Sequence, residues 1–184
     1  IFDFRLKKAP ISKIPGEKTS IYQPYLDLPE AFGRNIFQMN HLWSQDKKEN
    51  KKLLEKYSGY NFGFFEPYEL NKKTLQYNFH GGAEWMGGAV DQIKNIMFVT
   101  SNNILWEAEL ILDSKKKGLA PIYSSKFKRV LTMSGYPATK PPWGTLTALN
   151  LNSGKIIWQV PLGYYESLKL SNKNTGTENF GGAT

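Results

Sequence analysis

Residues 148–158 read ALNLNSGKIIW, and two alternating apolar runs, at 145–151 and 155–162, flank the tripeptide at 152–154. Alternation on both sides of a short turn that holds a glycine is typical of a β-hairpin, because the glycine takes the positive φ that the turn needs. We therefore predict a hairpin at this position. Its second strand is expected to direct Trp158 toward a neighbouring sheet.

The composition favours a globular, strand-rich protein. Of the 184 residues, 40% are hydrophobic and 14% are aromatic, enough to bury a sizeable core. Sixteen glycines and ten prolines, with short runs of aromatic residues, favour many strands and turns over a helix bundle. No window approaches the roughly eighteen apolar residues that a membrane-spanning helix requires.

The formal charge of +8 does not indicate a nucleic-acid partner. The excess is almost entirely lysine, whereas arginine, the planar donor favoured for phosphate recognition, occurs only at Arg5, Arg34 and Arg129. We therefore predict a solvated lysine-rich face and no nucleic-acid binding. The absence of cysteine excludes disulfides, thiolate metal sites and cysteine nucleophiles.

The N-terminal third is expected to be irregular and then helical. Four prolines between positions 1 and 38 predict a long loop, because each removes a backbone donor. A helix is predicted over 45–57, with Ser44 as its N-cap and with Leu53 and Leu54 facing inward.

Two insertions separate the predicted strands. Strands are predicted at 75–79, 96–101 and 105–112. The segment 36–72 is interpreted as a helical and aromatic insertion, and 113–142 as a polar, proline-punctuated loop insertion.

A local unit occurs twice. Ala-x-Asp at 89–91 is followed by Asn95 and a strand, and Ala-x-Asn at 148–150 is followed by Gly154 and a strand. A β-propeller repeats four-stranded blades about every 40–45 residues. We interpret the two units as two blades, with part of a third.

The hairpin stretch also has a family likeness. The spacing of Ala148, Asn150, Ser153, Gly154 and Trp158, with a glycine five residues beyond, resembles the tryptophan-docking motif of quinoprotein β-propellers. Asn150 stands for the usual Asp and Ser153 for the usual Thr. The resemblance implies that Trp158 is a structural residue between sheets.

Four further segments carry the resemblance along most of the chain. They read PGEKTSIYQP at 15–24, GGAEWMGGAVD at 81–91, PPWGTLTAL at 141–149 and GTENFGG at 176–182. Together they resemble the C-terminal half of the pyrroloquinoline quinone (PQQ)-dependent dehydrogenases, specifically the membrane glucose dehydrogenase type. Met86 is an extra residue relative to that pattern. The resemblance implies an all-β fold, with 1–184 as a fragment of one propeller domain, two to three blades and a short helical insertion.

The resemblance implies a function and a set of site residues. The family oxidises a sugar, polyol or cyclic alcohol with PQQ, bound beside Ca²⁺ or Mg²⁺, and passes the electrons to membrane quinone. Its pattern assigns Glu84, Trp85, Asn179, Phe180 and Gly181 to cofactor binding. For Trp85 the alternative is packing between blades, and for Asn179 it is a role in a glycine-rich turn. The catalytic base and the metal ligands are expected outside these residues, so the chain alone is expected to be inactive.

Location and partners follow from the same resemblance. It implies a periplasmic protein, tethered to the inner membrane through a segment elsewhere, with the rest of the propeller as a partner. A non-catalytic propeller scaffold that binds proteins is the alternative. Trp143 is expected either to pack under the 113–142 insertion or to stand at the pocket mouth. His41 and His80 lack the spacing of a zinc site, and His80 is the histidine to test for pocket contact.

The isolated 184-residue chain is predicted to aggregate or to exchange its amide hydrogens rapidly. A few blades leave strand edges unpaired and apolar sheet faces in water. Light scattering and hydrogen exchange measure the two effects. A cooperative thermal unfolding transition of a monomer would contradict this prediction.

Overall fold

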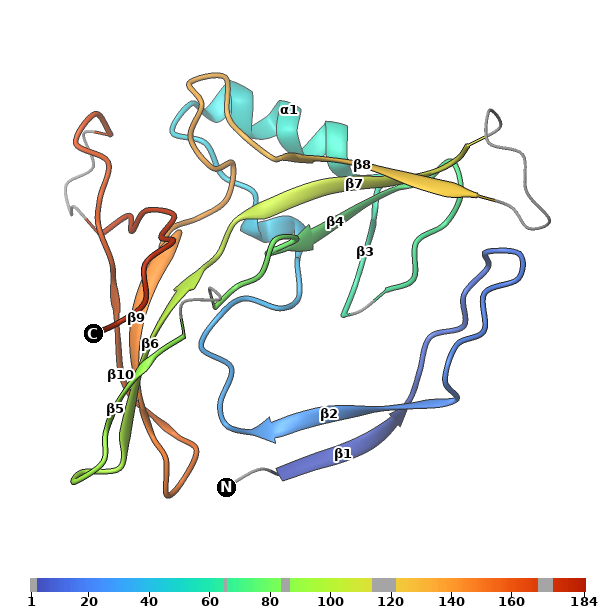
Figure 1. Cartoon of the computed structure of the whole chain (residues 1–184). Helices are drawn as coiled ribbons and strands as arrows, with labels where there is room; N and C mark the ends of the chain where they lie inside the picture. The colour runs from blue at the N-terminus through green and yellow to red at the C-terminus, as the bar shows by residue number, and fades with distance from the viewer. Residues whose placement is uncertain (1–2, 65, 84–86, 114–121, 169–173) are drawn as a thin grey trace.

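The computed structural model describes residues 3–64, 66–83, 87–113, 122–168 and 174–184. In these ranges ten strands accompany one α-helix and one short 3₁₀ helix. The strands form two four-stranded sheets and a separate two-stranded hairpin, and the sheets do not close on themselves (Figure 1). The predicted all-β, partial-propeller fold is confirmed.

The first four-stranded sheet, sheet I, contains the predicted hairpin. Its order is β10-β9-β6-β5, antiparallel throughout. Its strands are β5 (Ala89–Asp91), β6 (Ile96–Asn102), β9 (Gly144–Asn150) and β10 (Ile156–Pro161). Trp158 lies across β9 from Phe98, with ring centroids 5.9 Å apart in this one sheet, and is 40% exposed. Its docking against another sheet stays a prediction.

The two copies of the local unit form matching turns of sheet I. Asp91 Oδ1 accepts hydrogen bonds from the backbone N–H groups two and three residues further along the chain. Asn150 Oδ1 accepts the same two hydrogen bonds in its own turn. Asn95 and Gly154 then take positive φ values of 53° and 71°. Because both hairpins lie in the same sheet, the interpretation of the two units as two separate blades is wrong.

The second four-stranded sheet, sheet II, is joined to the first by one continuous run of chain. Only two residues separate β6 from β7, so an extended segment leaves sheet I and enters sheet II (Figure 1). The order of sheet II is β3-β4-β7-β8, from β3 (Asn61–Phe62), β4 (Lys73–Tyr77), β7 (Leu105–Leu112) and β8 (Tyr123–Arg129). The segment 113–142 therefore contains a strand where a loop was predicted.

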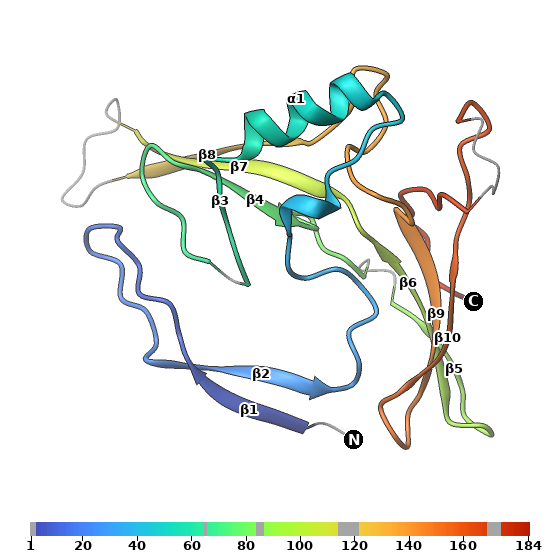
Figure 2. The same cartoon turned by 180° about the vertical axis from the view of Figure 1, so that it is seen from behind.

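One helix covers sheet II. Helix α1 (Lys47–Tyr57) lies on the face opposite the N-terminal hairpin, as both views show (Figures 1 and 2). Asp46, not the predicted Ser44, caps it by accepting from two backbone N–H groups. Leu53 is buried as predicted, whereas Leu54 is 36% exposed and Tyr57 takes the inward place one turn after Leu53. Among the described residues, no helix is long and apolar enough to cross a membrane.

The N-terminal region is not the irregular loop that its prolines predicted. Strands β1 (Asp3–Lys8) and β2 (Tyr22–Leu28) pair in antiparallel fashion, and Pro24 lies within β2. Proline is tolerated there because β2 has one hydrogen-bonded neighbour in this sheet. The hairpin contacts the remainder of the chain through Tyr25 and Phe64, whose ring centroids lie 4.7 Å apart.

Two apolar clusters form the core. The first lies between α1 and sheet II and comprises Phe37, Leu42, Leu53, Tyr57, Leu75, Tyr77, Leu105, Val130 and Ala138. The second lies beside the junction of the two sheets and comprises Ile104, Trp106, Trp143 and Leu168, with Trp43, Phe79, Tyr136 and Tyr165 packed against it. Both clusters contain a residue of β7, so the strand that joins the two sheets also joins the two clusters.

The C-terminal segment crosses the start of β9 in close contact. The Trp143 N–H donates to the Thr175 carbonyl at 2.7 Å. A Cβ atom built at Gly144 would overlap the carbonyl oxygen of Thr177, and one built at Gly176 would overlap the backbone of Gly144. The two glycines are required here because backbone packs directly on backbone.

Replacing Gly144 by alanine is expected to detach this segment. The added methyl group has no space, so Gly144→Ala should lower the free energy of unfolding by about 3 kcal/mol. Chemical denaturation of the protein expressed from its complete gene measures the change. Gly59→Ala is the matched control, because nothing lies within 4 Å of a Cβ at Gly59. Equal effects of the two substitutions would contradict the prediction.

Candidate functional site

Strand β6 is the element on which two glycine-rich segments converge. The Asn102 N–H donates to the Gly82 carbonyl at 2.8 Å, and Ala83 forms a β-bridge with Ser101. From the other segment, the Gly181 carbonyl accepts from Thr100 Oγ1 at 2.9 Å. Segments almost 100 residues apart in the sequence thus meet along three consecutive residues of β6.

Asn102 holds the C-terminal glycine-rich segment by a reciprocal pair of hydrogen bonds. Its Oδ1 accepts from the Asn179 N–H, and its Nδ2 donates to the Asn179 carbonyl, both at 2.8 Å. Asn102 is 3% exposed. A side-chain amide used in this way replaces a β-sheet partner for one residue of an otherwise irregular segment.

Asn103 and Asn78 hold the loop that follows β2. The Arg34 N–H donates to Asn103 Oδ1 at 2.8 Å, and the Arg34 carbonyl accepts from Asn78 Nδ2 at 3.2 Å. Asn103 Nδ2 also donates to the Pro142 carbonyl at 3.1 Å, and Asn78 Oδ1 accepts from the Ile104 N–H at 3.1 Å. The side chains of three asparagines thereby satisfy the Ile104 N–H at the junction of the sheets and backbone groups of the segments that meet it.

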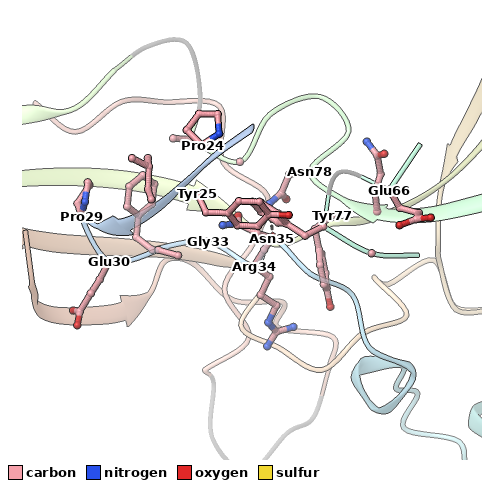
Figure 3. Close-up of a pocket in the computed structure, with 18 of the residues that line it drawn as sticks. Pro24, Tyr25, Pro29, Glu30, Gly33, Arg34, Asn35, Glu66, Tyr77 and Asn78 are labelled. Atoms are coloured by element: carbon pink, nitrogen blue, oxygen red, sulfur yellow. Dashed lines mark hydrogen bonds between the residues drawn. The ribbon is translucent and has the colours of Figure 1, made fainter. Parts of the chain in front are cut away.

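This loop forms one wall of a cavity of about 530 Å³. The N-terminal hairpin, strand β4 and the start of the 81–88 glycine run form the others. The lining side chains are aromatic and polar: Tyr25, Phe32, Phe64, Tyr77, Glu30, Arg34, Asn35, Glu66, Gln76 and Asn78 (Figure 3). The volume falls in the range of small-molecule sites.

The cavity wall is also fixed to the predicted hairpin. Glu30 accepts hydrogen bonds from the Ile156 N–H at 2.7 Å and from Lys155 Nζ at 3.0 Å. These donors hold the pKa of the Glu30 carboxyl below its usual value, the backbone N–H contributing most. Gln159 Nε2 donates to the Phe32 carbonyl at 2.8 Å, so the turn and the second strand of the hairpin both support the cavity.

Tyr77, which lines the cavity, pairs with a histidine. Tyr77 Oη lies 3.2 Å from His41 Nδ1, and the Arg34 guanidinium lies 5.9 Å from the Tyr77 ring centroid. Burial lowers the pKa of His41 below its ordinary 6.5, and the charges of Arg34 and Lys140 lower it further. Burial raises the pKa of the Tyr77 phenol. The pair is therefore favoured as neutral imidazole and neutral phenol.

The sequence-predicted site residues have different outcomes. Glu84 and Trp85, with the extra residue Met86, lie outside the described residues. Asn179 and Gly181 lie beside β6, as given above, and Phe180 is 58% exposed. Their contact with a cofactor stays a prediction.

The remaining two candidates, Trp143 and His80, pack against other aromatic residues. Trp143 is fully buried and its indole N–H donates to the Thr139 carbonyl at 2.8 Å, so it packs within the second cluster. His80 stacks on Trp106 with ring centroids 4.3 Å apart. It does not belong to the residues that line the cavity.

The sequence interpretation missed Asn78, Asn102, Asn103 and Arg34. The consecutive asparagines between two predicted strands were an available signal, because short amides favour positions where backbone groups lose their strand partners. Nothing in the sequence indicates which distant segments they bind. Among the described residues, no cluster of three or more His, Cys, Asp or Glu side chains is placed to hold a metal ion.

Comparison with known proteins identifies the family. The model of the PQQ glucose/ethanol/alcohol dehydrogenase β-propeller domain matches residues 1–184. The chain belongs to this family. Its similarity to a probable quinate dehydrogenase (quinone) of Xanthomonas campestris pv. juglandis is 30% identity over 101 residues, 45% of this chain and 13% of the relative. Its similarity to a quinate/shikimate dehydrogenase (quinone) of Acinetobacter baylyi is 24% identity over 176 residues, which are 83% of this chain and 21% of the relative.

These matches confirm the family inferred from the glycine-rich segments, including its cofactor, PQQ. The chain spans 13% and 21% of the length of the two relatives. The narrower assignment to the membrane glucose dehydrogenase type stays a prediction, and both relatives are named for quinate.

Part of the described glycine-rich backbone is open and leaves room for a flat ligand. A Cβ atom at Gly87 or Gly181 would have nothing within 4 Å, whereas one at Gly88 would meet the Phe98 carbonyl oxygen. The exposed ring of Phe180 adjoins Gly181. Uncovered backbone beside an aromatic face suits a planar cofactor, while the packed glycine serves contact within the protein.

Stability is expected to depend on the protonation of His41. Its pKa is lowered in the folded protein, so the unfolded chain binds a proton near pH 6.5 and the folded protein binds it only at lower pH. Stability should therefore fall as the pH drops below about 6.5, and His41→Gln should remove part of that slope.

Thermal unfolding of the full protein between about pH 7.5 and pH 5.5 measures this effect. His80→Gln is the control for loss of a histidine, since His80 is exposed and stacks on Trp106. The same pH dependence in the wild type and in His41→Gln would contradict the prediction.

Proposed function

We propose that the protein is a PQQ-dependent dehydrogenase that oxidises a polyhydroxylated alcohol and passes the electrons to a membrane quinone. The match of the family model to residues 1–184 carries the proposal. The convergence of two glycine-rich segments on β6 supports it, because the open backbone at Gly181 and the exposed Phe180 ring offer walls to a planar group. Both relatives bear names with quinone as the acceptor.

Within the class of sugars, polyols and cyclic alcohols, we propose a cyclic alcohol that carries a carboxylate. Both relatives are named for quinate, a compound of that kind. A site that binds such a compound needs ring-sized apolar walls and several polar groups for the hydroxyls. The cavity beside Arg34 has aromatic side chains that suit the ring and amide side chains that suit the hydroxyls.

The residues of this chain supply walls and orientation in this proposal. PQQ, when bound, supplies the redox step by accepting a hydride from the alcohol carbon. Asn179, Phe180 and Gly181, with Glu84 and Trp85, are proposed to adjoin it. A carboxylate base and the ligands of Ca²⁺ or Mg²⁺ are proposed to lie in other parts of the protein. The protein is also proposed to function in the periplasm and to be tethered to the inner membrane.

Reconstitution tests the proposal. The protein expressed from its complete gene, loaded with PQQ and Ca²⁺, is expected to reduce an artificial dye with quinate faster than with glucose or glycerol. The same preparation without PQQ is the control. Faster reduction with glucose would favour the membrane glucose dehydrogenase type. Inactivity with all sugars, polyols and cyclic alcohols would favour a non-catalytic propeller scaffold.

A further inference from the structure

Two adjacent asparagines leave β6 toward different segments. Successive side chains of extended chain point to opposite faces, and Asn102 and Asn103 stand next to each other at the end of β6. They are 3% and 4% exposed, so both are equally removed from water. Within the part of the chain that the structure describes, the two side chains bind different segments: Asn102 binds the backbone of Asn179, and Asn103 binds the backbone of Arg34 and Pro142.

The segment that Asn102 holds has few other anchors. Among the described residues, no hydrogen bond from backbone to backbone involves positions 178–184. Its other polar contacts in the described ranges include the hydrogen bond from Thr100 Oγ1 to the Gly181 carbonyl, one from Asn179 Nδ2 to the Thr177 carbonyl at 2.7 Å, and an ion pair of 2.7 Å between Glu178 and Arg129. The two bonds from Asn102 therefore fix the backbone of Asn179, next to Phe180 and Gly181.

The loop that Asn103 holds is fixed from two sides. Asn103 binds the Arg34 N–H and Asn78 binds the Arg34 carbonyl, so the backbone of this residue is held on both sides by side-chain amides. The Arg34 side chain is held in turn by the Lys140 and Pro141 carbonyls, at 2.6 and 3.2 Å. Arg34 lines the cavity, so Asn103 sets the place of that wall.

We propose that Asn102 and Asn103 are positioning residues with separate tasks: Asn102 orients the segment that adjoins the cofactor, and Asn103 orients the cavity wall that meets the substrate. This assignment rests on the proposed function. Neither residue touches the reacting atoms in it. Each acts through backbone that it holds by hydrogen bonds, whose removal from a buried site leaves polar groups without a partner.

The test compares two neighbouring substitutions of the same chemistry in the full protein. Asn102→Ala is expected to raise the Kd for PQQ about tenfold and to leave the KM for quinate within about twofold of wild type. Asn103→Ala is expected to do the reverse, raising KM about tenfold at an unchanged Kd for PQQ. Fluorescence quenching gives the Kd, and initial rates at saturating PQQ give KM.

Hydrogen exchange without cofactor supplies a readout that does not depend on activity. Asn102→Ala should speed exchange at the Asn179 N–H and leave the Arg34 N–H protected, and Asn103→Ala should do the opposite. Asn102→Asp keeps the acceptor for the Asn179 N–H, so it should restore that protection. If Asn102→Ala does not fold, Thr100→Val removes the neighbouring hydrogen bond to Gly181 and should raise the Kd for PQQ in the same direction.

Equal changes in Kd and KM in both variants, or loss of protection at both sites in each, would overturn the assignment and leave a general structural role. Failure of the wild type to bind PQQ would instead defeat the proposed function. The exchange experiment would then still decide whether the two asparagines act on separate segments.

Discussion

The fold depends on how one extended segment passes from sheet I to sheet II. Strands β6 and β7 are almost continuous, but each pairs with different neighbours, so the two residues between them change partners: the Asn103 N–H donates to the Trp143 carbonyl, and the Ile104 carbonyl accepts from the Asn78 N–H. Asn78 Oδ1 satisfies the Ile104 N–H, and the side chains of Asn102 and Asn103 satisfy backbone groups of the segments that meet this junction. Buried backbone without such partners is costly, which makes this junction the constraint around which the other segments are arranged.

The junction also explains how residues far apart in sequence reach one place. The glycine-rich segments pack along β6, and the cavity wall around Arg34 is held by the next residue of the chain. The glycines serve two different needs. Gly144 and Gly176 allow backbone to pack on backbone, whereas Gly181 stays open beside the Phe180 ring. Proximity of the proposed cofactor and substrate regions follows from this one strand.

Sequence patterns succeeded where a turn motif marks a hairpin and failed for two exposed strands, β1 and β8. The turn between β9 and β10 closes through Asn150 within three residues, which identifies the hairpin although β10 is exposed beyond its first residue. Strands β1 and β8 are also exposed along nearly their whole length. In β1, Phe4 and Leu6 alternate with charged residues, but the four prolines between positions 1 and 38 indicated a loop. Asp46 replaced Ser44 as the helix cap because its carboxylate reaches two N–H groups of the first turn.

The sequence by itself determined the turn of the 145–162 hairpin, strands β6, β9 and β10 of sheet I, the helix and the family, because each rests on residues close together or on motifs in register along the chain. Only the tertiary structure decided that both repeated hairpins share one sheet, that β8 completes the other, and that Asn102 and Asn103 serve different segments. Pairing between distant strands depends on which backbone groups and apolar faces remain unsatisfied once the chain is assembled, and no local pattern contains that information.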